Sequence, residues 1–193
     1  MRGILTVLSQ GGKWRARERP AADGHTVYPS DRRWVRQGVF TPLFAQSELP
    51  RQGSRRFLDA THVKGPRCAC PPSGGAAWPA LGRPKGGLNS QISAIVDEAG
   101  QAIRLGLRAG NDADLAHAQT LAEAIPGTRL VADKGCASDP FRAGRLARGM
   151  TPGIPPRSHR LKPCRYRRVS YRKRPGVENF FARLKNLRRV STR

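Results

Sequence analysis

From Arg56 onward, apolar and polar residues alternate in a way that predicts a series of strands and helices. The segment RRFLDATHV, which begins at Arg55, predicts a short strand with Asp59 inside it. Residues Gln91–Val96 and Ala102–Leu107 flank the turn residues Asp97–Gly100, and this arrangement predicts a β-hairpin. The pattern therefore predicts three strands in the first part of this region.

Helical spacing takes over further along the chain. Asp112–Ile125 has apolar residues three and four positions apart and carries aspartates at its start, which predicts a helix. Asp139–Arg148 predicts a shorter helix, and Val177–Val190 predicts a third, extended back to Pro175 because proline is tolerated in a first turn. The apolar face of the third helix is expected to consist of Phe180, Phe181, Leu184 and Leu187.

Two further strands are expected between these helices. Thr128–Ala132 has the composition of a buried strand and ends at Asp133, while Ile154–Pro156 predicts a brief extended segment. Strands and helices thus alternate, which predicts a mixed α/β layer fold. His159–Arg174 is expected to be a basic loop.

Residues 1–55 show a weaker pattern, with a short helix expected around Asp31–Gln37 and a linker at Ser47–Ser54. The chain carries 36 Lys and Arg residues against 13 Asp and Glu, a formal net charge of +23. Such an excess attracts polyanions, and the arginine fork suits phosphate. A coding bias toward Arg, Ala, Gly and Pro explains part of the arginine count but not its clustering.

The four cysteines do not form a zinc motif. Cys68 and Cys70 are paired as C-x-C, whereas Cys136 and Cys164 stand alone, so free thiols are the default expectation. The start of the chain lacks an adequate signal-peptide core, and no apolar stretch of about 18 residues is present. Neither secretion nor a membrane span is expected.

Three acidic residues occupy positions that suggest chemistry. Asp59 and Asp133 lie at or near the ends of expected strands, where α/β sheets bind ligands, and Glu178 begins the last helix. Carboxylates converging from three elements would form a site for Mg²⁺, and a pair of such ions supports in-line phosphoryl displacement. Each acid alone is equally consistent with a helix cap or a salt bridge.

Glu178 is the only acidic residue between Arg165 and the last residue, Arg193. On an ideal helix, Glu178 would share a stripe of roughly 60° with Tyr171, Arg174 and Lys185. Pro175 interrupts that helix, so only Glu178 and Lys185 are expected on one face. Tyr171 and Arg174 are then expected to approach from the preceding loop.

These residues match a known signature. Tyr171, Arg174, Glu178 and Lys185 have the spacing of the Y-R-E-K signature, and the chain resembles DDE transposases of bacterial insertion sequences, close to the insertion-sequence-five branch. Three further segments resemble motifs of that branch: LDATHVK (Leu58–Lys64), ALGRPKGGLNSQISAIVDEAGQAI (Ala80–Ile103) and VADKGCASD (Val131–Asp139).

The resemblance implies an RNase H-like sheet flanked by helices, in which Asp59, Asp133 and Glu178 form an acidic triad that holds two Mg²⁺ or Mn²⁺ ions. It implies DNA cleavage at element ends followed by strand transfer into target DNA, by a multimer in the cytoplasm, at the nucleoid. The residues expected to contact DNA are Tyr171, Arg174, Lys185, Arg83 and Lys85.

The chain also departs from the family pattern. Residues 1–55 are expected to be a degenerate remnant of an N-terminal DNA-binding region and linker, and residues 56–193 a catalytic domain truncated at its C-terminal end. Cys136 stands where the family usually has tyrosine. Two alternatives to an active transposase therefore stay open: a catalytically inactive basic DNA-binding remnant, and an unfolded product of a decayed gene.

Overall fold

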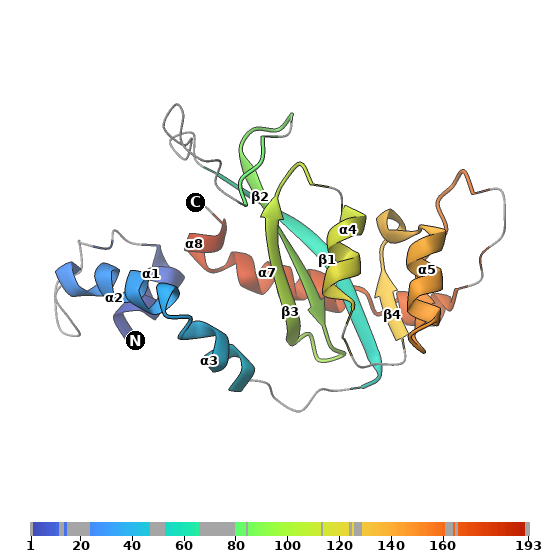
Figure 1. Cartoon of the computed structure of the whole chain (residues 1–193), viewed down its shortest axis with the longest axis horizontal. Coiled ribbons are helices and arrows are strands. Elements are labelled where there is room, and N and C mark those ends of the chain that lie inside the picture. Colours follow the sequence, from blue (N-terminus) through green and yellow to red (C-terminus); the bar gives the residue numbers. More distant parts are fainter. Residues whose placement is uncertain are drawn as a thin grey trace. The chain divides into compact units, whose positions relative to one another are not determined.

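The computed structural model contains a five-stranded sheet with the strand order β3-β2-β1-β4-β5 (Figure 1). The structure divides into two compact units, Met1–Pro50 with Arg183–Arg193 and Arg51–Ala182. The structure describes residues 2–11, 14, 24–46, 53–65, 80–83, 85–112, 114–123, 125, 129–160, 164 and 166–191.

The first unit is more helical than the sequence pattern suggested. It contains α1 (Arg2–Gln10), α2 (Gly24–Arg36), α3 (Phe40–Gln46) and α8 (Arg188–Ser191). The short helix expected at Asp31–Gln37 lies within α2, which begins seven residues earlier, and α1 and α3 were not expected. Proline ordinarily disfavours a helix interior, and Pro29 inside α2 hid the first half of that helix from pattern reading.

The second unit holds the sheet, and the expected hairpin is confirmed. Strands β2 (Asn89–Val96) and β3 (Ala102–Ala109) pair antiparallel, and β1 (Arg55–Lys64) pairs antiparallel with β2. On its other side β1 pairs parallel with β4 (Arg129–Ala132), so the sheet is mixed.

The last strand is β5 (Thr151–Gly153), which pairs parallel with β4 at the sheet edge. The sequence pattern placed this strand at Ile154–Pro156, which was wrong by three residues. Pro152 argued against a strand at the true position, because proline cannot donate a ladder hydrogen bond. An edge strand tolerates proline, and β5 is one.

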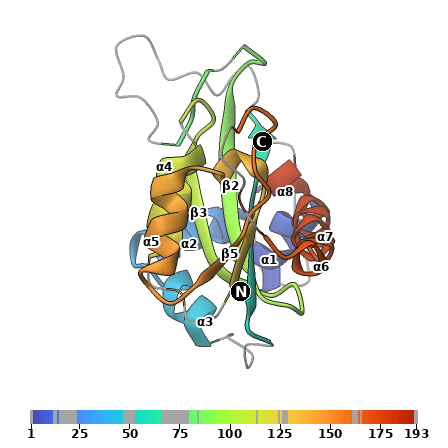
Figure 2. The same cartoon turned by 90° about the vertical axis from the view of Figure 1, so that its right-hand side faces the viewer.

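Helices α4 (Asp114–Leu121) and α5 (Asp139–Leu146) lie on one face of the sheet (Figure 2). Both were expected, although α4 is shorter than the predicted Asp112–Ile125. Ser138 caps α5 by accepting a hydrogen bond from the amide of Phe141 at 3.2 Å. The main hydrophobic core lies between these helices and the sheet and includes Leu58, Ile95, Ala118, Leu121, Leu130, Ala132, Cys136, Phe141 and Ile154.

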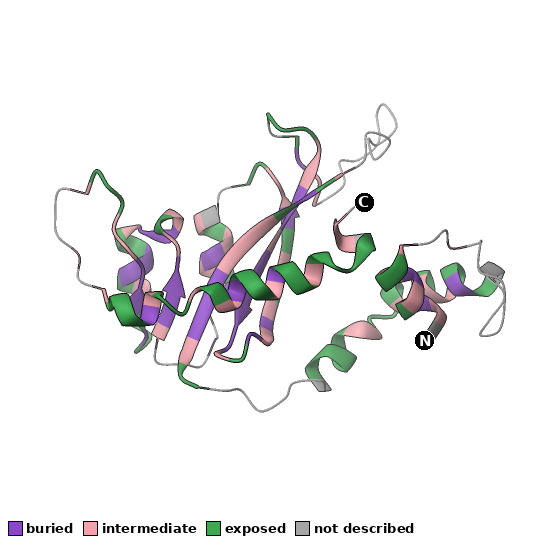
Figure 3. Cartoon of the chain, turned by 180° about the vertical axis from the view of Figure 1, so that it is seen from behind, coloured by how far each residue is buried: buried purple, intermediate pink, exposed green. Residues whose placement is uncertain are grey.

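Helices α6 (Arg168–Tyr171) and α7 (Pro175–Lys185) lie on the opposite face (Figure 2). Val177 and Phe181 of α7 are buried four residues apart, whereas Leu187 is exposed beyond the helix end (Figure 3). The predicted single helix Val177–Val190 was therefore wrong beyond Lys185, because a turn separates α7 from α8.

The expected fold class is confirmed: a mixed sheet carries helices on both faces, in the strand order of an RNase H-like domain. No helix in the described part of the chain has the length and apolar content needed to cross a membrane.

Candidate active site

Asp59 and Asp133 lie side by side on neighbouring parallel strands. The last paired residues of β1 and β4 are Leu58 and Ala132, and each aspartate is the next residue along its strand. Parallel strands lie about 4.8 Å apart, so the two carboxylates share one end of β4. Asp59 was expected at a strand end, but β1 continues for five residues to Lys64 and keeps pairing with β2. Asp59 is left without a paired residue on its β4 side because β4 ends at Ala132.

Both aspartates line a pocket of about 160 Å³. Polar side chains from β1 and β2 complete its wall, together with residues of the η2 turn (Lys134–Cys136) and α4. The lining residues besides the aspartates are Leu58, Ala60, His62, Gln91, Ser93, Ala118 and Cys136. His62 lies three residues after Asp59 on β1, so strand alternation places the two side chains on opposite faces of the sheet, and the sequence pattern did not indicate His62.

Arg174 connects the third acid to this pair. One guanidinium nitrogen of Arg174, Nη2, donates to Asp59 Oδ2 at 2.7 Å, and the other, Nη1, donates to Glu178 Oε1 at 2.8 Å. The side chains of Asp59 and Arg174 are 17% and 20% exposed, whereas that of Glu178 is 54% exposed. The structure therefore links Glu178 to Asp59 through an arginine that stands between their carboxylates.

The charge state of Asp59 reflects this crowding. Burial raises the pKa of the Asp59 carboxyl above its usual range, Arg174 and the amide of Ala60 act to lower that pKa, and the neighbouring Asp133 raises it further. Asp133 is oriented differently, because its Oδ1 accepts a hydrogen bond from the amide of Gly135 at 2.9 Å and caps the η2 turn. Among the described residues, no three His, Cys, Asp or Glu side chains form a metal-binding cluster.

Two of the expected cationic contacts lie far from the acids. Arg83 and Lys85 are exposed in the loop before β2, where Asn89 pairs with Lys64 at the end of β1. Five residues of strand separate Lys64 from Asp59, a distance of about 17 Å.

Tyr171 and Lys185 complete the expected signature. Tyr171 is the last residue of α6, not part of a loop as expected, and its ring meets Tyr166 edge to face at 6.0 Å between centroids. Lys185 lies on the same helix as Glu178, as predicted, but it is the last residue of α7; it is exposed and belongs to the unit that contains Arg183–Arg193.

The cysteines give no sign of a metal site in the part of the chain that the structure describes. Cys136 is buried beside the pocket and Cys164 is partly buried, and both are free of disulfides. Cys68 and Cys70 lie outside the described residues.

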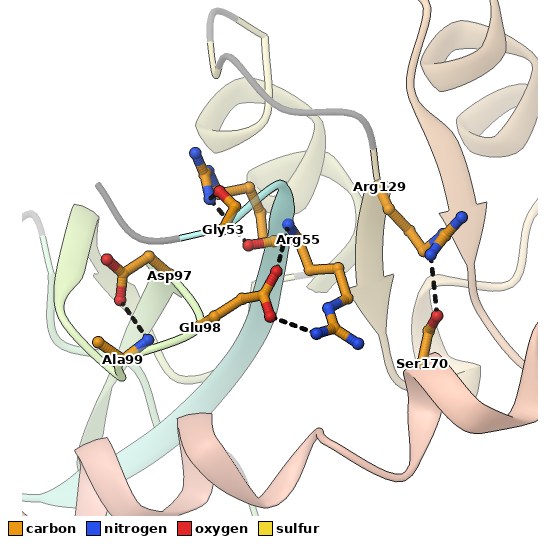
Figure 4. A network of polar contacts seen from close by, with 8 residues as sticks. Gly53, Arg55, Asp97, Glu98, Ala99, Arg129 and Ser170 are labelled. Carbon is orange, nitrogen blue, oxygen red and sulfur yellow. Dashed lines mark hydrogen bonds and ion pairs between the residues drawn. The ribbon is translucent and has the colours of Figure 1, made fainter. Parts of the chain in front are cut away.

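A second polar network anchors the strands that carry the acids (Figure 4). The guanidinium of Arg55, the first residue of β1, pairs with Glu98, whose Oε1 also accepts from the amide of Arg55 at 3.2 Å. Arg129, the first residue of β4, donates from Nη1 to Ser170 Oγ of α6 at 3.0 Å. These contacts fix the starts of β1 and β4, and the sequence pattern did not indicate them.

Comparison with known proteins places this chain in a family. A transposase DDE domain model matches residues 50–193. A solved piggyBac transposase synaptic complex with hairpin DNA is 12% identical, with a TM-score of 0.49, covering 73% of this chain and 42% of that one. The Mos1 transposase paired-end complex with left transposon end is 11% identical, with a TM-score of 0.34, covering 93% and 66%. No curated protein matches the chain. From the match over residues 50–193, the chain belongs to the family of transposase DDE domains.

Proposed function

We propose that residues 56–193 form the catalytic part of a transposase that cuts DNA at the ends of a mobile element and joins the freed strand to target DNA. The observation that carries this proposal is the pair of aspartates on adjacent strands, Asp59 and Asp133, with Glu178 linked to Asp59 through Arg174. Membership of the transposase family supports it.

The donor chemistry of the site fits divalent metal ions, which this family generally uses. Carboxylate oxygens are the ligands that Mg²⁺ and Mn²⁺ prefer, and Asp59, Asp133 and Glu178 supply them from three separate elements. The guanidinium of Arg174 stands between Asp59 and Glu178, so a positive charge already occupies the position proposed for a metal ion. When bound, two such ions would lower the pKa of the attacking hydroxyl and neutralise charge on the leaving oxygen.

The chain's own residues then have distinct roles. Asp59 and Asp133 are placed by the sheet and need no rearrangement to face the same pocket. Glu178 is more exposed and lies in the first turn of α7, so a small movement of that helix start changes its distance from the aspartates. In this proposal the helix start closes onto the pair when DNA is bound.

Arg174 is proposed to exchange partners during this closure. Its planar fork binds two oxygens of a phosphate as readily as two carboxylates. In the absence of DNA it balances the charge of Asp59 and Glu178, and a DNA phosphate would draw it away from them. Tyr171, Lys185, Arg83 and Lys85 are proposed to hold the DNA backbone further from the cut, where contacts position the strand without reading its sequence.

Strand nicking of DNA in the presence of Mn²⁺ or Mg²⁺ tests the proposal. Asp59→Asn, Asp133→Asn and Glu178→Gln should each reduce the rate by about a hundredfold or more, because each removes a charged oxygen ligand from the site. Asp112→Asn is the matched control, since Asp112 is exposed in the turn after β3. Nicking by Glu178→Gln at the rate of the unmodified protein would contradict the assignment of the third acid.

A second candidate is a non-catalytic DNA-binding protein. It is favoured by the position of Arg174 between Asp59 and Glu178, and by the lack of a three-residue ligand cluster in the described part of the chain. In the same nicking assay, tight DNA binding by the unmodified protein without metal-dependent cleavage would select this candidate.

A further inference from the structure

A second pocket, distinct from the one that the acids line, opens beside the edge strand β5. Its volume is about 190 Å³, the space of about six water molecules in the liquid. It is lined by Arg129, Thr151, Pro152, Gly153, Tyr166 and Arg167. No acidic residue is among these, so the lining favours an anionic ligand.

The two arginines of this pocket lack acidic partners. Arg129 donates through Nη1 to Ser170, its Nε is buried without a hydrogen-bond partner, and it forms no ion pair with any described residue. Arg167 is exposed, and its guanidinium likewise forms no ion pair with any described residue. Ser170 holds Arg129 in place, while Arg167 adds a second positive charge at the mouth.

An aromatic ring accompanies these cations. Tyr166 packs edge to face against Tyr171, with an angle of 87° between the ring planes. This contact restrains the Tyr166 ring, and most of the pocket wall around it is apolar. Proteins that bind single-stranded nucleic acid combine these two features, with cations along the backbone and aromatic rings beneath the bases.

The distance from this pocket to the acids corresponds to a few nucleotides of a DNA strand. Arg129 is the first residue of β4 and Asp133 follows the last, so about 13 Å of strand separates them. That span is roughly four nucleotides of B-DNA. Arg129 and Ser170 also place the pocket on the face of the sheet that carries α6 and Arg174.

We propose that this pocket binds one unpaired nucleotide of a DNA strand, with its phosphate on Arg129 and Arg167 and its base on Tyr166. The proposal rests on the proposed function in that the ligand is DNA. It adds a binding site that lies outside the Y-R-E-K signature and involves none of the three acids.

Binding of fluorescent DNA to the full chain in EDTA tests this, because cleavage does not occur there. The probes are a mixed-sequence duplex with a single-stranded overhang and the same duplex with blunt ends. Tyr166→Leu should weaken overhang binding roughly tenfold by removing the stacking ring, and leave blunt-duplex binding unchanged. Tyr166→Phe keeps the ring and should bind like the unmodified protein.

Arg167→Ala tests the phosphate contact and avoids any folding problem at Tyr166, because Arg167 is exposed. It should weaken overhang binding and reduce the slope of log affinity against log salt by about 0.9. Arg148→Ala is the matched control, since Arg148 is exposed beyond the end of α5 on the opposite face of the sheet. The proposal is overturned if Arg167→Ala matches Arg148→Ala, or if Tyr166→Leu affects both DNA probes equally.

The two proposals fail in different ways. If the unmodified protein shows no metal-dependent nicking, the proposed catalytic function is contradicted, but the preference for the overhang in EDTA is unaffected. Loss of the overhang preference counts against the pocket alone.

Discussion

At the scale of single residues, Arg174 is the most constrained cation in the site. It is largely buried and bridges two carboxylates that belong to elements far apart in the sequence. Burial acts to lower its pKa, but Asp59 and Glu178 raise it above the ordinary value. Arg174 is therefore charged at any working pH, and its release needs another anion, not a proton.

This position leads to a prediction about metal affinity. If Arg174 competes with a divalent ion for Asp59 and Glu178, Arg174→Gln should bind Mn²⁺ about tenfold more tightly without DNA, equivalent to about 1.4 kcal/mol. Calorimetry or the electron paramagnetic resonance signal of free Mn²⁺ measures this. Arg172→Gln is the control, because Arg172 is exposed and two residues away. Equal affinities of the two variants would show that Arg174 and the metal do not compete.

At the scale of elements, the β2–β3 turn fastens the start of β1. Asp97 is buried and its Oδ1 accepts from the amides of Ala99 and Gln101, both at 2.9 Å, while Glu98 reaches out to Arg55. Gly53 has a φ of 67°, and any side chain there would collide with Glu98. A short turn thus holds the strand on which Asp59 lies.

The charge of Glu98 makes this fastening sensitive to acid. Arg55 lowers the pKa of Glu98 to about 2 in the folded protein, from an ordinary 4.5. Because the folded pKa is depressed, the carboxylate stabilises the fold above pH 4.5, and this contribution is lost as the pH falls toward 2.

Glu98→Gln should therefore unfold at a lower temperature than the unmodified protein at pH 7, by an amount corresponding to about 1 kcal/mol. The difference should shrink as the pH approaches 2. Circular dichroism melts at several pH values measure it, with Glu123→Gln as the control because Glu123 is exposed. A difference that stays constant with pH would argue that Glu98 acts by packing and not by charge.

The sequence predicted some of these strands and helices and misplaced others. The hairpin, β1, β4 and α5 were predicted because their apolar positions repeat with a clear period, and Asp59 and Asp133 followed from those strands. β5 and α2 were misplaced because each contains a proline that local rules count against it. The Arg174–Asp59 contact joins residues 115 positions apart, and only the packing of α6 and α7 on the sheet creates it.

At the scale of the whole molecule, the positive charge has two uses. Among the described residues of the second unit, four arginines are buried: Arg56, Arg108, Arg142 and Arg145. Arg142 donates to the carbonyl of Ile154 at 2.7 Å, and Arg145 donates to the carbonyl of Ala122 and packs over Phe141. These side chains stabilise the fold, and the exposed cations are the ones proposed to contact DNA.

Those exposed cations predict strongly salt-dependent DNA binding. With six or more phosphate contacts, affinity should fall by about a thousandfold between 50 and 200 mM salt. Two unrelated DNA sequences should show similar slopes, because backbone contacts carry no sequence information. Anisotropy titrations measure the slope. A slope near zero would mean that the excess of Lys and Arg in this chain does not serve to bind nucleic acid.

One last consequence concerns self-association. β5 ends the sheet with a three-residue strand whose middle residue, Pro152, has no amide hydrogen to offer. Growth of the sheet by strand addition is blocked there, whereas β3 is an edge of ordinary length with Leu105 and Leu107 exposed. Aggregation during purification is therefore expected to proceed along β3. Leu105→Lys or Leu107→Lys is the substitution expected to reduce it.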